Sequence, residues 1–77
     1  MNPGDMIIAI RSVQLRLGPY PSDRWITHKE KDLFTLRDTK VDIDGDQWSE
    51  LVAADGRVFS LYGAEDALEF DGRFRQL

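Results

Sequence analysis

Apolar and polar residues alternate along most of this chain, a pattern typical of half-buried β-strands. Residues 6–17 predict one long strand with Ile8 and Ile10 on one apolar face, but the apolar phase changes before Val13. A strand with a side-chain period of two residues changes phase only at a bulge or a sharp bend. We therefore expect a bend near Arg11 and Ser12, of the kind that a small barrel needs in order to close.

Three Asp-Gly pairs, at 44–45, 55–56 and 71–72, mark tight turns between strands. Alternating segments flank the first two pairs, so residues 33–62 predict a three-stranded antiparallel meander. A second change of phase falls around Asp38. The first Asp-Gly pair is expected to form a type I′ turn, a common two-residue hairpin connection.

The remaining segments are less regular. Residues 18–32 begin with a glycine and contain two prolines, which predicts a long loop after the first strand. Residues 63–69 predict one short helical turn, and residues 70–74 predict a last short strand or hairpin. A helix over residues 28–38 is the weaker alternative, because its apolar residues cluster instead of recurring at helical spacing. The predicted fold is mainly β, a small barrel in which an antiparallel five-stranded meander forms one domain over residues 1–77.

Composition narrows the class of protein. Hydrophobic residues make up 42% of the 77 residues, which is typical of one folded domain. The chain has no cysteine, so disulfides and thiolate metal sites are excluded, as is usual in a reducing compartment. Its longest apolar run, residues 6–10, is far shorter than the roughly 20 residues of a membrane helix. No basic segment precedes that run, so we expect no signal peptide, no membrane association and a cytoplasmic location.

The net charge of −4 is unevenly distributed. Residues 1–40 carry seven Lys and Arg against five Asp and Glu, whereas residues 41–77 carry three against nine. Nonspecific nucleic-acid binding requires a basic surface, so the overall balance disfavours it while the first half keeps it open. The acidic second half is expected to bind a basic patch on a partner.

Three aspartates, Asp42, Asp44 and Asp46, have the spacing of the first ligands in an EF-hand calcium loop. That loop also needs glycine at its sixth position and glutamate at its twelfth, where this chain has Gln47 and Ala53. The flanking residues predict strands instead of helices. We therefore interpret the segment as an acidic hairpin turn and expect no metal site.

The sequence offers little for catalysis. His28 is the only histidine and is expected to lie exposed in the long loop, with no cysteine or nucleophile motif to accompany it. The six glycines are scattered and match no nucleotide-binding loop. A domain of this size also has little room for a cleft that excludes water. We expect no catalytic residue and no cofactor, and hence no enzyme.

The long loop is instead the predicted contact surface. It concentrates the residue types that are enriched at protein interfaces, followed by two lysines. The candidate protein-binding residues are Tyr20, Arg24, Trp25, His28, Lys29 and Lys31. In the alternative interpretation, Trp25 and Ile26 fold back to cap an open end of the barrel. The expected core includes Phe34, Leu36, Trp48, Phe59 and Leu61.

Three stretches resemble those of small SH3-like and KOW-like barrel proteins, including phage-encoded ones. They are Pro3-Gly4-Asp5-Met6-Ile7, Trp48 with Asp55-Gly56-Arg57-Val58-Phe59, and Glu65-Asp66-Ala67-Leu68-Glu69. The resemblance implies an SH3-like barrel, and such barrels bind peptides, proteins or nucleic acid. The paired tyrosines and tandem tryptophans of proline-rich-peptide binders are missing here, so the resemblance does not extend to that activity.

Three functions are compatible with the sequence. The favoured one is a small non-enzymatic protein-binding module, such as a phage or mobile-element accessory protein that modulates a larger host or virion assembly in the host cytoplasm. The alternative is a nucleic-acid-binding domain, in which Trp25 stacks on a base and basic residues contact phosphates. Those basic residues are Arg11, Arg16, Arg24, Lys29, Lys31, Arg37 and Lys40. The third is self-association through an open sheet edge, and a homodimer is compatible with all three.

Overall fold

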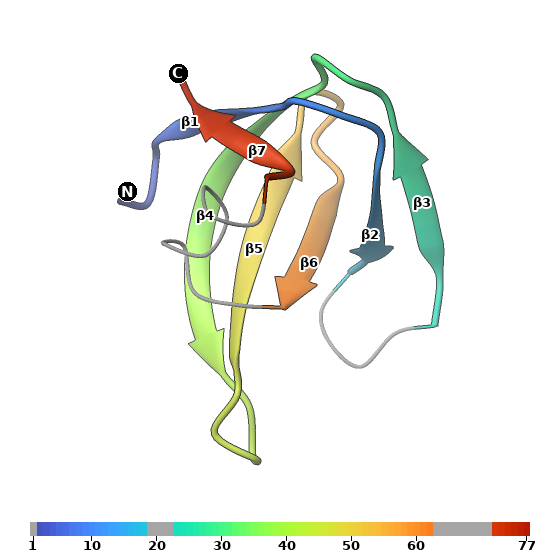
Figure 1. The fold of residues 1–77 in the computed structure, drawn as a ribbon. Helices are drawn as coiled ribbons and strands as arrows, with labels where there is room; N and C mark the ends of the chain where they lie inside the picture. The colour runs from blue at the N-terminus through green and yellow to red at the C-terminus, as the bar shows by residue number, and fades with distance from the viewer. Residues whose placement is uncertain (1, 19–22, 63–71) are drawn as a thin grey trace.

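The computed structural model describes residues 2–18, 23–62 and 72–77. These residues form seven β-strands in one antiparallel sheet that curls into a half-barrel (Figure 1). The strands are β1 (Met6–Ala9), β2 (Val13–Leu17), β3 (Trp25–His28), β4 (Leu33–Val41), β5 (Gln47–Ala53), β6 (Val58–Tyr62) and β7 (Phe74–Gln76). Their order across the sheet is β3-β2-β6-β5-β4-β1-β7. The prediction of a mainly β, barrel-like fold is confirmed.

The predicted number of five strands is wrong for two reasons. The segment 6–17 bends at residues 10–12 and so contributes two strands, β1 and β2. β3 lies inside residues 18–32, where the sequence predicts only a loop. It forms a strand because it pairs with β2 and its side chains suit a strand. The predicted helical turn at 63–69 lies outside the described residues, and the last strand begins at Phe74, where the prediction ends.

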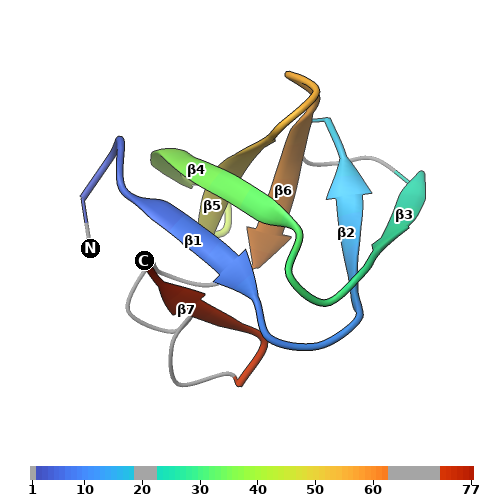
Figure 2. The ribbon, with the colours of Figure 1, turned by 90° about the horizontal axis from the view of Figure 1, so that it is seen from above.

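The bend in the first segment explains how the sheet curls. β1 pairs with β4, whereas β2 pairs with β6 on the opposite side of the meander. The bent segment therefore crosses from one side of the meander to the other, and the strands surround a common interior (Figure 2). The bend lies where it is predicted, but the apolar phase before it differs. Ile7 and Ala9 are buried, whereas Ile10 is 39% exposed.

β4, β5 and β6 form the predicted three-stranded meander. The register between β4 and β5 shifts between Leu36 and Asp38, where the sequence predicts a change of phase. This irregularity lets β4 keep apolar side chains inward before the shift and polar ones outward after it. The β4–β5 hairpin projects beyond the ends of β6 and β2 (Figure 1).

The turn of that hairpin is not the predicted type I′ turn. The N–H of Gly45 donates to the carbonyl of Asp42 (3.0 Å), and the N–H of Asp42 donates to the carbonyl of Asp46 (2.9 Å). Gly45 has a φ of +84°, whereas Asp44 is not in the left-handed region. This is a type I turn followed by one left-handed residue, and it needs a single glycine where a type I′ turn needs two left-handed residues.

The core fills the interior of the curled sheet. Its buried hydrophobic side chains are Ile7, Ala9, Val13, Leu15, Phe34, Leu36, Leu51, Phe59, Leu61 and Phe74. The Phe34 ring makes edge-to-face contacts with Phe59 and Phe74, at centroid distances of 6.3 and 5.8 Å. The predicted core residues are confirmed except Trp48, which is half-buried and lies on the outer face. Within the described residues, no helix is long and apolar enough to cross a membrane.

Candidate functional site

An aromatic strip crosses the outer face of the sheet, on the side away from the core. It consists of Trp25 on β3, Arg16 on β2, Trp48 on β5 and Tyr62 on β6. Trp25 is directly opposite Arg16 in the strand register, and Trp48 is directly opposite Tyr62. Side chains of paired residues project from the same face. The neighbouring residues Leu15, Ile26 and Leu61 are in the core or packed against it, which places the strip on the opposite face.

Arg16 connects the two tryptophans of the strip. Its guanidinium carbon lies 4.7 Å from the ring centroid of Trp25 and 5.6 Å from that of Trp48. Both distances are within the range of cation–π attraction. Trp48 in turn makes an edge-to-face contact with Tyr62, with centroids 5.3 Å apart and ring planes at 83°. Each of the four side chains therefore contacts at least one other member of the strip, yet Trp25 remains 53% exposed and Tyr62 59% exposed.

An acidic turn, residues 42–46, lies against Trp48 and Tyr62 of the strip. The Nε1–H of Trp48 donates to Oδ2 of Asp42 (2.9 Å), and the Tyr62 hydroxyl donates to Oδ1 of Asp46 (3.4 Å). Oδ1 of Asp42 accepts the N–H groups of Asp44 and Asp46 at 2.9 and 3.0 Å. The bond from Trp48, together with these backbone bonds, lowers the pKa of Asp42 below its ordinary 3.8. Asp42 therefore stays ionised at neutral pH and fixes the turn against the strip.

The tip of the same hairpin combines apolar side chains with carboxylates. Val41 is 63% exposed and Ile43 is fully exposed, next to Asp42. Further along β4, the Nζ of Lys40 lies 2.6 Å from Oε1 of the buried Glu50. Among the residues that the structure describes, no group of three or more His, Cys, Asp or Glu is arranged to hold a metal ion. The tip therefore presents exposed apolar side chains and carboxylates in one turn.

The six predicted contact residues do not form one patch. Arg24 and Trp25 lie at the start of β3, whereas Lys29 and Lys31 lie in the turn beyond its other end, all of them exposed. Lys31 has a left-handed backbone, with φ of 76°. Tyr20 lies outside the described residues. Of the predicted set, Trp25 is the residue that the strip includes.

His28 is buried, which corrects the prediction of an exposed loop histidine. It ends β3 with only 6% of its surface exposed, because the strand turns it toward the core. Its ring makes edge-to-face contacts with Phe34 and Phe59, at centroid distances of 5.0 and 4.5 Å, and its Nδ1 lies 3.7 Å from Oδ2 of Asp32. Desolvation lowers the pKa of His28 below 6.5, helped by Arg57 and opposed by Asp32. His28 is therefore neutral at pH 7.

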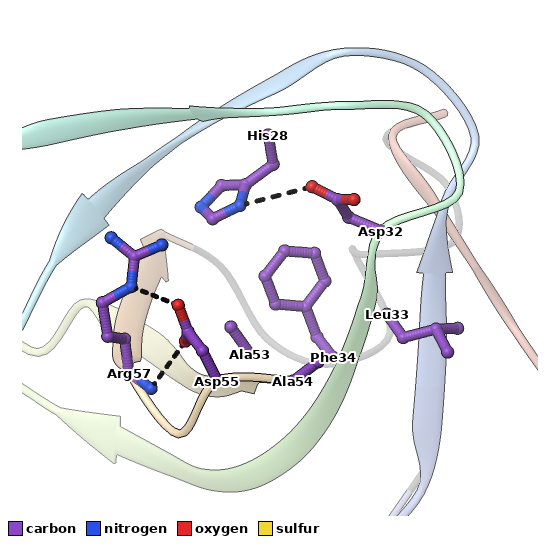
Figure 3. A pocket seen from close by; sticks show the side chains of 8 residues that line it. All are labelled: His28, Asp32, Leu33, Phe34, Ala53, Ala54, Asp55 and Arg57. Carbon is purple, nitrogen blue, oxygen red and sulfur yellow. Dashed lines mark hydrogen bonds and ion pairs between the residues drawn. The ribbon is translucent and has the colours of Figure 1, made fainter.

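A half-open cavity of about 190 Å³ lies beside His28 (Figure 3). Its rim carries Asp32, Asp55 and Arg57, and the Nε–H of Arg57 donates to Oδ2 of Asp55 at 2.7 Å. Bonds from Arg57, first its backbone N–H and then its side chain, lower the pKa of Asp55. Among the described residues, no hydroxyl or thiol side chain lines the cavity.

Arg16 and Tyr62 complete the strip, although neither is among the residues predicted to bind a protein. The signal that places Tyr62 on the outer face is its alternation with the buried Leu61 and Phe59 on one strand. The signal for Arg16 is the burial of Leu15 beside it. Alternation gives the face of each residue, but it does not give the order of the strands that brings them together.

Comparisons with known proteins identify no relative: no protein family model, no curated protein and no solved structure matches this chain. The function is therefore inferred from the chemistry of the site.

Proposed function

We propose that this protein is a small non-enzymatic protein-binding module whose contact surface is the aromatic strip together with the acidic turn. The observation that carries the proposal is the exposure of Trp25 and Tyr62, the first and last members of a chain of contacts that runs through Arg16 and Trp48. Trp, Tyr and Arg are the residue types that dominate binding energy at interfaces. The contacts with Arg16 and Trp48 restrain the rings before binding, which reduces the entropy lost on association.

The partner presents a basic segment that also carries apolar side chains. The carboxylates of Asp42 and Asp46 in the acidic turn accept hydrogen bonds from Trp48 and Tyr62. Ile43 is fully exposed in the same turn. A partner Lys or Arg meets these carboxylates, while an apolar side chain packs on the exposed rings. The net charge of −4 favours encounters with a basic surface.

The wider role rests on the sequence resemblance. Small SH3-like proteins, including phage-encoded ones, are similar in the stretches around Gly4, Trp48 and Gly56. The curled antiparallel sheet is compatible with that architecture. On this basis the protein is an accessory factor of a phage or mobile element, acting in the host cytoplasm on a larger host or virion assembly.

Nucleic-acid binding is the second candidate, and the exposed ring of Trp25 beside Arg24 is the observation that favours it. The distribution of charge weighs against it. Lys40 is paired with Glu50, and Lys29 lies at the opposite end of β3 from Arg24. Carboxylates, which repel phosphates, border the strip at Trp48 and Tyr62.

A pull-down from a lysate of the source organism tests the proposal, with and without nuclease and at low and moderate salt. The wild type is compared with the double variant Trp25→Ala/Tyr62→Ala and with Leu77→Ala. Leu77 is a matched control because it is 60% exposed and follows β7, at the other end of the strand order from β3.

The expected result is a protein band that survives nuclease, is retained by Leu77→Ala and falls at least about tenfold with the double variant. A signal that disappears with nuclease and falls steeply with salt would replace this proposal with nucleic-acid binding. A band that the double variant retains in full would show that the strip is not the contact surface.

A further inference from the structure

β3 ends the strand order, and within the described residues no strand pairs with its outer edge. Natural sheets protect such an edge with charged side chains, proline or a bulge. β3 (Trp25–His28) contains no proline and no residue that is charged at neutral pH, and its pairing with β2 is regular. Its outer edge is therefore available to another strand.

The register between β2 and β3 shows which backbone groups face that edge. The N–H of Leu17 donates to the carbonyl of Arg24 at 2.8 Å. Hydrogen-bonded and non-hydrogen-bonded pairs alternate along an antiparallel ladder, so Ile26 also directs its N–H and C=O toward β2. The N–H and C=O groups of Trp25 and Thr27 consequently point outward.

We propose that a second copy of this chain pairs with the edge, forming an antiparallel β3–β3 dimer whose two-fold axis passes through Ile26. In this register Trp25 of one copy lies opposite Thr27 of the other, and the symmetry repeats the pair. The two pairs use every outward-facing backbone group of β3. Each pair also sets an aromatic side chain beside a β-branched one, which is a favourable cross-strand combination.

Charges that flank the strand select the same register. Asp23 and Lys29 are exposed and lie three residues before and after Ile26, so each faces the other across the two-fold axis. A register shifted toward Lys29 requires its N–H, which already donates to Oδ2 of Asp32 at 3.0 Å. A shift in the other direction separates Asp23 from Lys29. The surface is therefore self-complementary in one register.

This dimer goes beyond the proposed function and does not depend on it. It uses the backbone edge of β3 and leaves Tyr62 and the acidic turn open to a partner. The two aromatic strips meet at Trp25 across the new pairing, so a dimer presents them as one longer surface. A variant that changes only the edge separates the two proposals.

Thr27→Pro is that variant. Proline removes the outward N–H of Thr27 and no backbone hydrogen bond to β2, and edge strands tolerate proline at such positions. Like any variant without the hydroxyl, it also loses the bond from Nε2 of Gln14 to Oγ1 of Thr27 (3.4 Å). Thr27→Val keeps the N–H and the β-branched shape, so it serves as the matched control. Sedimentation velocity is measured up to about 1 mM protein, where even a millimolar Kd gives detectable dimer. Circular dichroism confirms that each variant is folded.

We expect concentration-dependent dimers for the wild type and Thr27→Val. For Thr27→Pro we expect the dimer dissociation constant to rise about tenfold or more. Charge exchange tests the register without proline. Asp23→Lys and Lys29→Asp alone each place like charges across the axis and weaken dimerisation about tenfold, whereas an equimolar mixture restores it. A monomeric wild type, a dimer that Thr27→Pro leaves intact, or a mixture that fails to associate would overturn the proposal.

Discussion

The indole Nε1–H of Trp48 donates a hydrogen bond of 2.9 Å to Oδ2 of Asp42, which joins the tip of the β4–β5 hairpin to the aromatic strip. Backbone bonds from Asp44 and Asp46 occupy the other oxygen of the same carboxylate. One side chain therefore shapes the turn and orients a ring of the proposed contact surface.

Asp42→Ala should lower the melting temperature and loosen the hairpin, because it removes a bond to Trp48 and two bonds to the turn. Asp44→Ala is the control, since the turn uses the backbone N–H of Asp44 and retains it in that variant. The folded pKa of Asp42 is lowered, so its stabilisation is present above pH 3.8 and is lost as the pH falls through the folded value. Thermal melts at pH 7 and pH 3 measure both effects. Equal losses for the two variants at pH 7 would contradict the role of Asp42.

The two tryptophans should respond differently to truncation. Trp25→Ala is expected to cost less than about 1 kcal/mol of unfolding free energy, because its ring is 53% exposed. Trp48→Ala is expected to cost about 2–3 kcal/mol, because it removes the bond to Asp42 and the edge contact with Tyr62. Urea denaturation followed by circular dichroism measures both values. The assignment of Trp25 to the surface is wrong if its variant is the less stable one.

Phe34→Ala should unfold the protein or nearly so. The ring lies in the centre of the core and contacts His28, Phe59 and Phe74. Removing it costs about 3–5 kcal/mol, which approaches the total stability of a small domain. Phe34→Leu, which keeps most of the apolar volume, should lose roughly 1–2 kcal/mol and remain folded. The far-ultraviolet circular dichroism spectrum distinguishes the two, and a fully folded alanine variant would contradict the assigned core.

His28 should make the stability of the fold sensitive to mild acid. Its pKa is lowered in the folded state, so the unfolded chain binds the proton more readily. Stability is therefore full above pH 6.5 and declines as the pH falls from 6.5 toward the folded pKa. The charged groups that face the ring are Asp32, Asp55 and Arg57. The urea midpoint of the wild type should fall between pH 7 and pH 5, and this fall should be absent in the variant His28→Leu. An equal fall in the variant would show that other groups cause the pH dependence.

Alternation of side chains predicts the parts of the fold that depend on local pattern. The β4–β5–β6 meander, the irregularity near Asp38 and the burial of Phe34 and Phe59 all follow from it. Each of these strands has at least five residues, which is enough for a period of two residues to be visible. The bend between β1 and β2 is also predictable, because a long strand must break in order to curl.

The features of the fold that the sequence does not predict depend on pairing between distant segments. β3 has only four residues and follows a segment rich in proline, so its pattern alone does not distinguish it from a loop. Its strand state comes from β2, and that pairing turns His28 inward. The aromatic strip depends on the strand order, which no local pattern encodes, so the sequence does not show that Arg16 lies beside both Trp25 and Trp48.

Site-specific photocrosslinking in the source organism tests the contact surface most directly. A photoreactive phenylalanine analogue replaces Tyr62, and the same analogue at the exposed Arg75 on β7 is the control. The account predicts a discrete protein adduct from position 62 that resists nuclease, and no such adduct from position 75. Adducts to nucleic acid, or the same adducts from both positions, would contradict it.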